Sequence, residues 1–209
     1  DDDDTGPDDD DSAGFDEGTL IITEIHFDPS GDDDGREWVE VYNPGAAALD
    51  LQFWSLADFA GQTAVVGQPL SIAAGGYFVF GTSTDQGFNG GAPVDFAWGP
   101  NITLDQPDDE VVLLDPSGNA VDVVVYNGNW PVAPGASLSL DPGAFDASAN
   151  DDFAVWCVSP ALAYGSTSDL GSPGADNPPC PATGDDDDSV GDDDDAGPDD
   201  DDAGPDDDD

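Results

Sequence analysis

The sequence contains no lysine, one arginine and one histidine, against 49 acidic residues, of which 44 are aspartate. Its formal net charge is −48 over 209 residues. One cation cannot neutralise a run of phosphates, so ordinary nucleic-acid binding and docking onto anionic lipid are excluded. No signal peptide is present, and no apolar run reaches the roughly 18 residues of a membrane span. We therefore expect no direct membrane insertion in this segment.

Catalytic side chains are also scarce. His26 is the only histidine, and no serine lies in the G-x-S-x-G turn of a nucleophile elbow. Without lysine there is no Gly-rich phosphate loop ending in Lys. Paired carboxylates could hydrolyse a glycoside, but among 49 acids any chosen pair is uninformative. We expect no catalytic residue and no enzyme activity in this chain.

The acids fall into two populations. Residues 1–18 and 181–209 hold 26 of the 49 acids, mostly as aspartate tetrads with a repeat of seven residues. Glycine and proline between the tetrads break helices, and almost nothing apolar can be buried, so we expect both tails to be disordered acidic spacers. Carboxylates suit hard cations, but a dedicated site needs a fixed cage, so we expect only weak, delocalised binding of divalent cations.

Residues 19–180 are predicted to form one folded domain. They keep 23 acids and Arg36, a net charge of −22, and enough apolar residues for a sizeable core. Short runs rich in Val, Ile, Thr and aromatics alternate with turn residues, and no stretch keeps a 3.6-residue period. The pattern predicts an all-β antiparallel sandwich or barrel. Strands are expected at 20–27, 37–42, 49–56, 63–66, 76–80, 101–104, 109–114, 120–126, 136–140 and 153–158.

Cys157 and Cys180 are the only sulfur-containing residues. A disulfide between them would attach the irregular C-terminal segment to the last strand, and would stabilise the fold by roughly 3 kcal/mol in the chain-entropy model. Two buried free thiols are the alternative, whereas a metal site would have only His26 as a further ligand. Paired cysteines indicate an oxidising compartment.

The acidic loop 28–37 is the best candidate for a metal site. Its spacing does not fit an EF-hand, because the glutamate nearest the twelfth position falls one residue short. A different, weak Ca²⁺ site and a solvated turn between two strands are the two alternatives. The ligands of such a site would be Asp28, Asp32, Asp34 and Glu37. No other cofactor is expected.

Two glutamates are predicted to have structural roles. Alternation places Glu24 beside His26, and Glu40 between Trp38 and Tyr42. A carboxylate that large residues flank on a strand face is expected to be partly buried, and it then needs hydrogen-bond partners.

The tryptophans are assigned mainly to packing. Trp38 and Trp54 lie in expected strands, where a core role is the default. Trp98 and Trp130 lie in segments rich in Gly, Pro and Asn, where an exposed ring could bind a sugar or a peptide.

Several motifs resemble those of a known family. Residues 22–26 read ITEIH, 37–45 read EWVEVYNPG, 49–56 read LDLQFWSL, 109–115 read DEVVLLD and 171–177 read GSPGADN. In this order the motifs resemble the lamin tail domain family, over nearly all of the predicted domain. The resemblance implies an immunoglobulin-like β-sandwich without catalytic residues. Bacterial members of the family resemble exported or surface proteins.

One family property is not expected here. Nuclear lamin tails bind chromatin and proteins through basic surfaces, whereas this chain has Arg36 as its only Lys or Arg. Nucleic-acid binding is therefore not carried over.

Composition and resemblance together favour a non-catalytic β-sandwich module at the cell surface or outside the cell, carried on acidic spacers for display, adhesion or tethering. A lipoprotein anchor elsewhere in a longer protein would fit this localisation. The alternative is an accessory domain of an exported hydrolase, of nuclease or phosphatase type, whose catalytic part lies outside this chain. Proteins or neutral glycans are the expected partners. Adaptation of an acidic surface to high salt is a third explanation of the charge.

Overall fold

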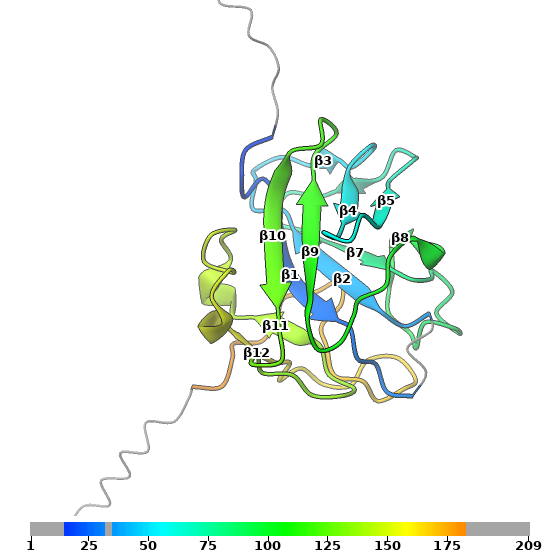
Figure 1. Cartoon of the computed structure of the whole chain (residues 1–209), viewed down its shortest axis with the longest axis vertical. Helices are drawn as coiled ribbons and strands as arrows, with labels where there is room; N and C mark the ends of the chain where they lie inside the picture. The colour runs from blue at the N-terminus through cyan, green and yellow to red at the C-terminus, as the bar shows by residue number, and fades with distance from the viewer. Residues whose placement is uncertain (1–14, 32–34, 183–209) are drawn as a thin grey trace, which may run out of the picture.

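The computed structural model describes residues 15–31 and 35–182 (Figure 1). Within these ranges the regular secondary structure consists of β-strands and short 3-10 helices, so the all-β prediction is confirmed. The strands are β1 Ile21–His26, β2 Trp38–Tyr42, β3 Leu49–Asp50, β4 Ser55–Ala57, β5 Thr63–Val65, β6 Ser71–Ile72, β7 Tyr77–Gly81, β8 Phe96–Ala97, β9 Asp109–Leu114, β10 Ala120–Tyr126, β11 Leu138–Leu140 and β12 Trp156–Val158. The 3-10 helices are η1 Gly99–Asn101, η2 Pro142–Ala144 and η3 Phe153–Val155.

Two sheets form a sandwich. The larger sheet has six strands in the order β12-β11-β1-β2-β7-β8, and the smaller has four in the order β10-β9-β4-β5. Strands β3 and β6 form a separate two-stranded ribbon. In Figure 1 the strands β9 and β10 lie in front of β1 and β2. The strand pairs of the described chain are antiparallel apart from β7 and β8, which are parallel. The predicted antiparallel sandwich is confirmed with this one exception at a sheet edge.

The main core lies between the two sheets. Val39 and Val41 point into it from β2, Val111 and Leu113 point into it from β9, and Trp54 fills it beside them. Because side chains alternate along a strand, the intervening residues of β2 point to the opposite face of the larger sheet. Burial of this apolar surface stabilises the domain by about 25 cal/mol for each Å² removed from water.

The opposite face of the larger sheet is covered as well. Trp38 and Val79 form a second small cluster there with Ala92, and Val94 and Tyr164 pack against it. Strand β1 is consequently buried on both faces along its whole length. Among residues 15–31 and 35–182, no comparable apolar cluster covers the far face of the smaller sheet, where Val65 and Val125 are exposed although Val112 is buried.

Three strand predictions were wrong in their details. The run 153–158 is a strand only from Trp156 onward, because Phe153–Val155 form the 3-10 helix η3. The run 49–56 is divided into β3 and β4, because Phe53 adopts a φ of 71° and interrupts the extended backbone. Residues 101–104 form no strand, since the backbone N–H groups of Thr103 and Leu104 donate to the side chains of Gln62 and Glu37. The short strands β6 and β8 were not predicted.

The predicted tails, 1–18 and 181–209, lie mostly outside the described residues. Residues 15–18, however, pack on the sandwich. The ring of Phe15 lies 4.8 Å from that of Trp54, and the Gly18 N–H donates to the Val121 carbonyl over 2.8 Å. The folded unit therefore begins before residue 19. Across the described ranges, no helix has the length and apolar character needed to cross a membrane.

Candidate binding surface

A buried pair of glutamates lies on the covered face of the larger sheet. Glu24 of β1 and Glu40 of β2 are directly opposite each other in the strand register, and neither side chain is accessible to water. Burial raises the pKa of Glu24 to about 7. Burial, and then the charge of Glu24, raises the pKa of Glu40 well above its ordinary value.

Both carboxylates hold residues 171–177, which we call the C-terminal segment. Glu24 accepts hydrogen bonds from the Ser172 N–H and hydroxyl, and Glu40 accepts one from the Gly174 N–H at 2.6 Å. Two further hydroxyl groups donate to the pair: Ser137 donates to Glu24 at 2.5 Å, and Thr23 donates to Glu40 at 2.9 Å. The pair is thus enclosed by donors from the fold, which leaves no room for a substrate.

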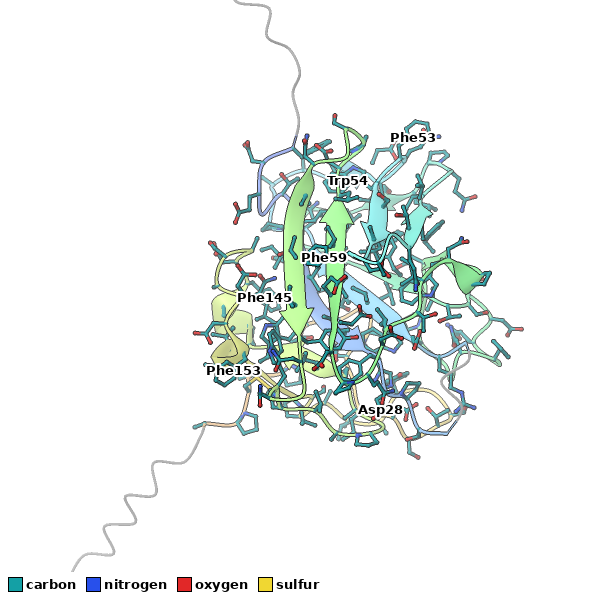
Figure 2. The ribbon with its side chains drawn as sticks, viewed as in Figure 1. Asp28, Phe53, Trp54, Phe59, Phe145 and Phe153 are labelled. Atoms are coloured by element: carbon teal, nitrogen blue, oxygen red, sulfur yellow. A yellow bond between two sulfur atoms is a disulfide. The ribbon has the colours of Figure 1, made fainter. Side chains whose placement is uncertain are left out.

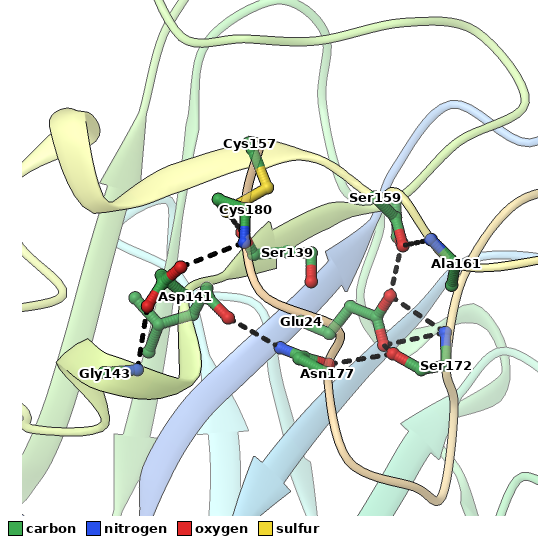
Figure 3. Close-up of a disulfide and its surroundings, with 12 residues drawn as sticks. Glu24, Ser139, Asp141, Gly143, Cys157, Ser159, Ala161, Ser172, Asn177 and Cys180 are labelled. Atoms are coloured by element: carbon green, nitrogen blue, oxygen red, sulfur yellow. Dashed lines mark hydrogen bonds between the residues drawn. A yellow bond between two sulfur atoms is a disulfide. The ribbon is translucent and has the colours of Figure 1, made fainter. Parts of the chain in front are cut away.

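Cys157 and Cys180 form a disulfide with a Cα–Cα distance of 5.8 Å (Figure 3). The predicted disulfide is therefore present, and it joins β12 to the residues that follow the C-terminal segment. The Cys180 N–H donates to Asp141, and the Asn177 side chain donates to the carbonyls of Thr23 and Leu140. Together these contacts fix the C-terminal segment across the larger sheet.

His26 lies on the same covered face, between the rings of Trp38 and Tyr164. The Trp38 indole N–H donates to the Tyr164 hydroxyl at 2.9 Å, so Trp38 is fully packed, as is Trp54 in the main core. His26 Nε2 lies 3.9 Å from Asp169 Oδ2, and neither ring nitrogen has a hydrogen-bond partner within residues 15–31 and 35–182. Burial alone would raise the pKa of Asp169, but the adjacent His26 ring, and then hydrogen bonds from Ser30 and Thr167, lower it.

The predicted Ca²⁺ ligands are only partly placed by the structure. Asp32 and Asp34 lie outside the described residues. Glu37 is buried, and its Oε2 accepts a hydrogen bond from the Leu104 N–H, whereas Asp28 accepts one from Gly135 through its backbone carbonyl. No three His, Cys, Asp or Glu side chains within residues 15–31 and 35–182 are placed to hold a metal ion. Ca²⁺ binding by loop 28–37 stays a prediction.

The assignment of the tryptophans to packing holds for Trp98 and Trp130 as well, and the alternative of exposed rings is wrong, since their exposed fractions are 1% and 7%. Tertiary packing, which local composition does not report, buries both rings. The aromatic ring exposed near this region is Phe88. It lines an open hollow of about 690 Å³ with Thr82 and Gln106, among other residues.

The most unusual surface lies on the side of the smaller sheet that faces away from the core. Strand register and alternation place ten side chains there, a set that we call the outer face: Ser55, Ala57, Thr63, Val65, Glu110, Val112, Leu114, Ala120, Val123 and Val125. Glu110 is the only charged residue among them. Apart from Ser55, Thr63 and Glu110 the set is apolar, which is notable in a chain of net charge −48.

Parts of the outer face are open to water. The exposed fractions are 51% for Val65 and 49% for Val125, and Phe59, which follows β4, reaches 69%. The Phe59 N–H donates to the Glu110 carboxylate, which ties the turn after β4 to β9. Figure 2 shows Phe59 on the side of the smaller sheet that faces the viewer.

An acidic hollow borders the outer face along β10. Its volume is about 210 Å³, and it is lined by Glu17, Ala120, Val121, Asp122, Val123, Ala147 and Asp151. Glu17 and Asp151 are exposed, whereas Asp122 is only 3% exposed. Asp122 Oδ2 accepts hydrogen bonds from the Ile22 N–H and the Asn150 amide, but its buried Oδ1 has no hydrogen-bond partner in the part of the chain that the structure describes. Burial raises the pKa of Asp122 to about 7.

The fold places the chain among immunoglobulin-like β-sandwich domains. The family model described as Lamin Tail Domain matches residues 14–128, more than half of the sequence. The chain belongs to the lamin tail domain family, a family of non-catalytic immunoglobulin-like domains. No curated protein matches the chain. Strands β11 and β12, the disulfide and the C-terminal segment lie beyond the matched residues, whereas the outer face lies within them.

Sequence reasoning missed the outer face and the hollow beside it. A signal for the face was present, because β9 and β10 carry apolar residues on both of their faces rather than in strict alternation. A strand with two apolar faces is normally covered on both sides. Nothing in the sequence indicated that the larger sheet would receive a second cover and the smaller sheet would not.

Proposed function

We propose that this chain is a non-catalytic binding module that attaches to a protein partner through the outer face. In the finer form of the proposal, the module acts outside the cytoplasm in display, adhesion or tethering, and the Asp-rich segments serve as spacers. The observation that supports this proposal is the composition of the outer face. One of its ten side chains is charged, whereas 24% of the residues in the whole sequence are charged. Exposed apolar patches with polar rims are typical of interaction sites.

The disulfide supports the proposed location. Disulfides persist in oxidising compartments and are rare where thioredoxin and glutathione keep thiols reduced. The Cys157–Cys180 bond lies at the end of the fold where the C-terminal spacer begins. It would therefore keep the end of the domain attached to β12 when the spacer is pulled.

The test is retention of the module on cells. The full chain is labelled, added to the cells that produce it, and the bound amount is measured for the wild type and for Phe59→Ser/Val65→Thr/Val125→Thr. Threonine keeps the shape and strand preference of valine but adds a hydroxyl, so the strands should persist. We expect most of the binding to be lost.

A matched control replaces exposed apolar residues in segments away from the smaller sheet, as Val132→Thr/Phe153→Ser/Leu162→Thr. This control should bind as the wild type does. Equal binding by all three proteins, or equal loss in both variants, would refute the role of the outer face.

A second candidate function is recognition of a neutral glycan in the hollow that Phe88 lines. Exposed Phe88 could stack on a sugar ring, while Thr82, Thr103 and Gln106 line the same hollow with polar groups. Titration with neutral oligosaccharides, followed by tryptophan fluorescence or NMR, tests it. Saturable binding that Phe88→Ala abolishes would support this function, and no saturable binding would exclude it.

A further inference from the structure

The outer face has few candidate occupants within this sequence. Apart from three prolines, the segments 1–14 and 183–209 contain Val190 as their only apolar residue larger than alanine, so their composition does not suit them to cover a row of valines. A second copy of the chain would bring another −48 charges against the first. Juxtaposed like charges oppose association, and they do so most strongly at low salt.

The acidic hollow beside Val123 indicates which chemical groups a partner of the outer face would carry. Val123 belongs to the outer face and also lines the hollow, so the two features form one continuous surface. Glu17 and Asp151 lie on the rim, and the buried Asp122 Oδ1 lacks a partner. A cationic side chain that enters the hollow from the outer face would meet the exposed carboxylates of Glu17 and Asp151.

We infer that the outer face binds a protein whose contact surface is apolar at its centre and carries a lysine or arginine that enters the hollow between Glu17 and Asp151. This inference rests on the proposed function and adds the partner's chemistry to it. The apolar area supplies the driving force for association. The surrounding negative charge steers a basic partner into place and selects against acidic ones.

Three synthetic β-hairpin peptides test the partner's chemistry. They share one valine-rich face and carry Lys, Gln or Glu at the flanking positions. Affinity for the full chain is measured by calorimetry at 0.05 and 0.5 M NaCl. The Lys peptide should bind about tenfold more tightly than the Gln peptide at low salt, the Glu peptide should bind weakest, and salt should reduce the difference.

Two variants separate site-specific attraction from attraction to the acidic tails. Glu17→Gln/Asp151→Asn removes two charges from the hollow and should bring the affinity for the Lys peptide down to that for the Gln peptide. Asp200→Asn/Asp207→Asn removes the same charge from the C-terminal tail and should change neither affinity appreciably. The outer-face variant Phe59→Ser/Val65→Thr/Val125→Thr should weaken both peptides about tenfold without changing the net charge.

The two proposals fail in different ways. If the Lys and Gln peptides bind equally well and both depend on the outer face, the basic partner is excluded but the binding face stands. If the Lys peptide binds all variants equally, or no peptide binds through the outer face, both ideas fail. If the full chain sediments as a dimer that the outer-face substitutions dissociate, the occupant is a second copy and the inferred basic partner is wrong.

Discussion

Glu24 and Glu40 lie opposite each other on adjacent strands, and both are fully buried although each can carry a negative charge. Two close carboxylates in a low-dielectric environment disfavour joint ionisation. They are retained at the centre of a sheet, and they hold the C-terminal segment by its backbone N–H groups. The last described part of the chain is thereby coupled to the first strands of the sandwich.

Replacement of Glu40 should show how much this contact contributes to the free energy of unfolding. Glu40→Ala leaves the Gly174 N–H and the Thr23 hydroxyl without their acceptor, so we expect the free energy of unfolding to fall by about 3 kcal/mol. Urea unfolding followed by tryptophan fluorescence measures the change. Glu40→Gln is the matched control, because its amide can accept from Gly174 and donate to the Thr23 hydroxyl. An unchanged midpoint for Glu40→Ala would count against the structural role.

Stability should decrease as pH rises from 5 to 8. Burial raises the pKa of Glu24 to about 7 and that of Asp122 to about 7, and it raises that of Glu40 as well. A carboxyl whose pKa is higher in the folded state stabilises the fold fully below its unfolded pKa. That contribution is lost as pH rises through the folded value. Glu24 and Asp122 each lose stabilisation over about two pH units between pH 5 and 7, so we expect a total loss on the order of 5 kcal/mol across this range.

The same titration has an internal control. The pKa values of Asp115, Asp146 and Asp169 are lowered, so their contribution is lost only at acid pH, below the range tested. Glu40→Gln should flatten the profile between pH 5 and 8, since one of the raised carboxyls is then absent. A free energy of unfolding that rises with pH over this range would contradict the burial argument.

The disulfide should contribute to stability by holding the C-terminal segment. Removal of both sulfurs in Cys157→Ser/Cys180→Ser frees a loop whose ends are 23 positions apart, which costs roughly 3 kcal/mol in the chain-entropy model. Thermal unfolding of the variant, and of the wild type with and without reductant, measures this. A variant that melts at the wild-type temperature would show that the hydrogen bonds of Glu24 and Glu40 hold the segment without help.

The acidic loop 28–37 can be tested for Ca²⁺ directly. The melting temperature of the full chain is compared in Ca²⁺ and in chelator, for the wild type and for Asp32→Asn/Asp34→Asn. A site in the loop predicts a Ca²⁺-dependent increase that this variant loses and that Asp200→Asn/Asp207→Asn keeps. Identical curves for the wild type in Ca²⁺ and in chelator would exclude the site.

The fold could be predicted from the sequence because its strands are local patterns. The alternating runs around Trp38 and the valines of β10 match the structure within one or two residues. The break at Phe53 could not be predicted, since a positive φ at a phenylalanine is held by tertiary hydrogen bonds rather than by local preference. Short strands such as β8 depend on a neighbouring strand and leave almost no local signal.

The surroundings of the candidate surface could not be predicted from the sequence, because they depend on contacts between residues that are far apart in it. Burial of Glu24 and Glu40 was expected from alternation, but their partner Ser172 is 148 residues from Glu24. The hollow beside Val123 likewise combines Glu17 and Asp151, which lie far apart in the sequence. Residue patterns show which strands have two apolar faces, and only the three-dimensional arrangement shows which of those faces stays uncovered.

The most direct test of the central claim is site-specific photo-cross-linking. A photoreactive side chain is placed at Val65, on the outer face, or at Leu162, an exposed loop position away from the smaller sheet, and cells carrying the full chain are irradiated. We predict one discrete cross-linked protein from position 65, absent from position 162 and lost when Val123→Thr/Val125→Thr is added. Identical products from both positions, or none from position 65, would contradict binding through the outer face.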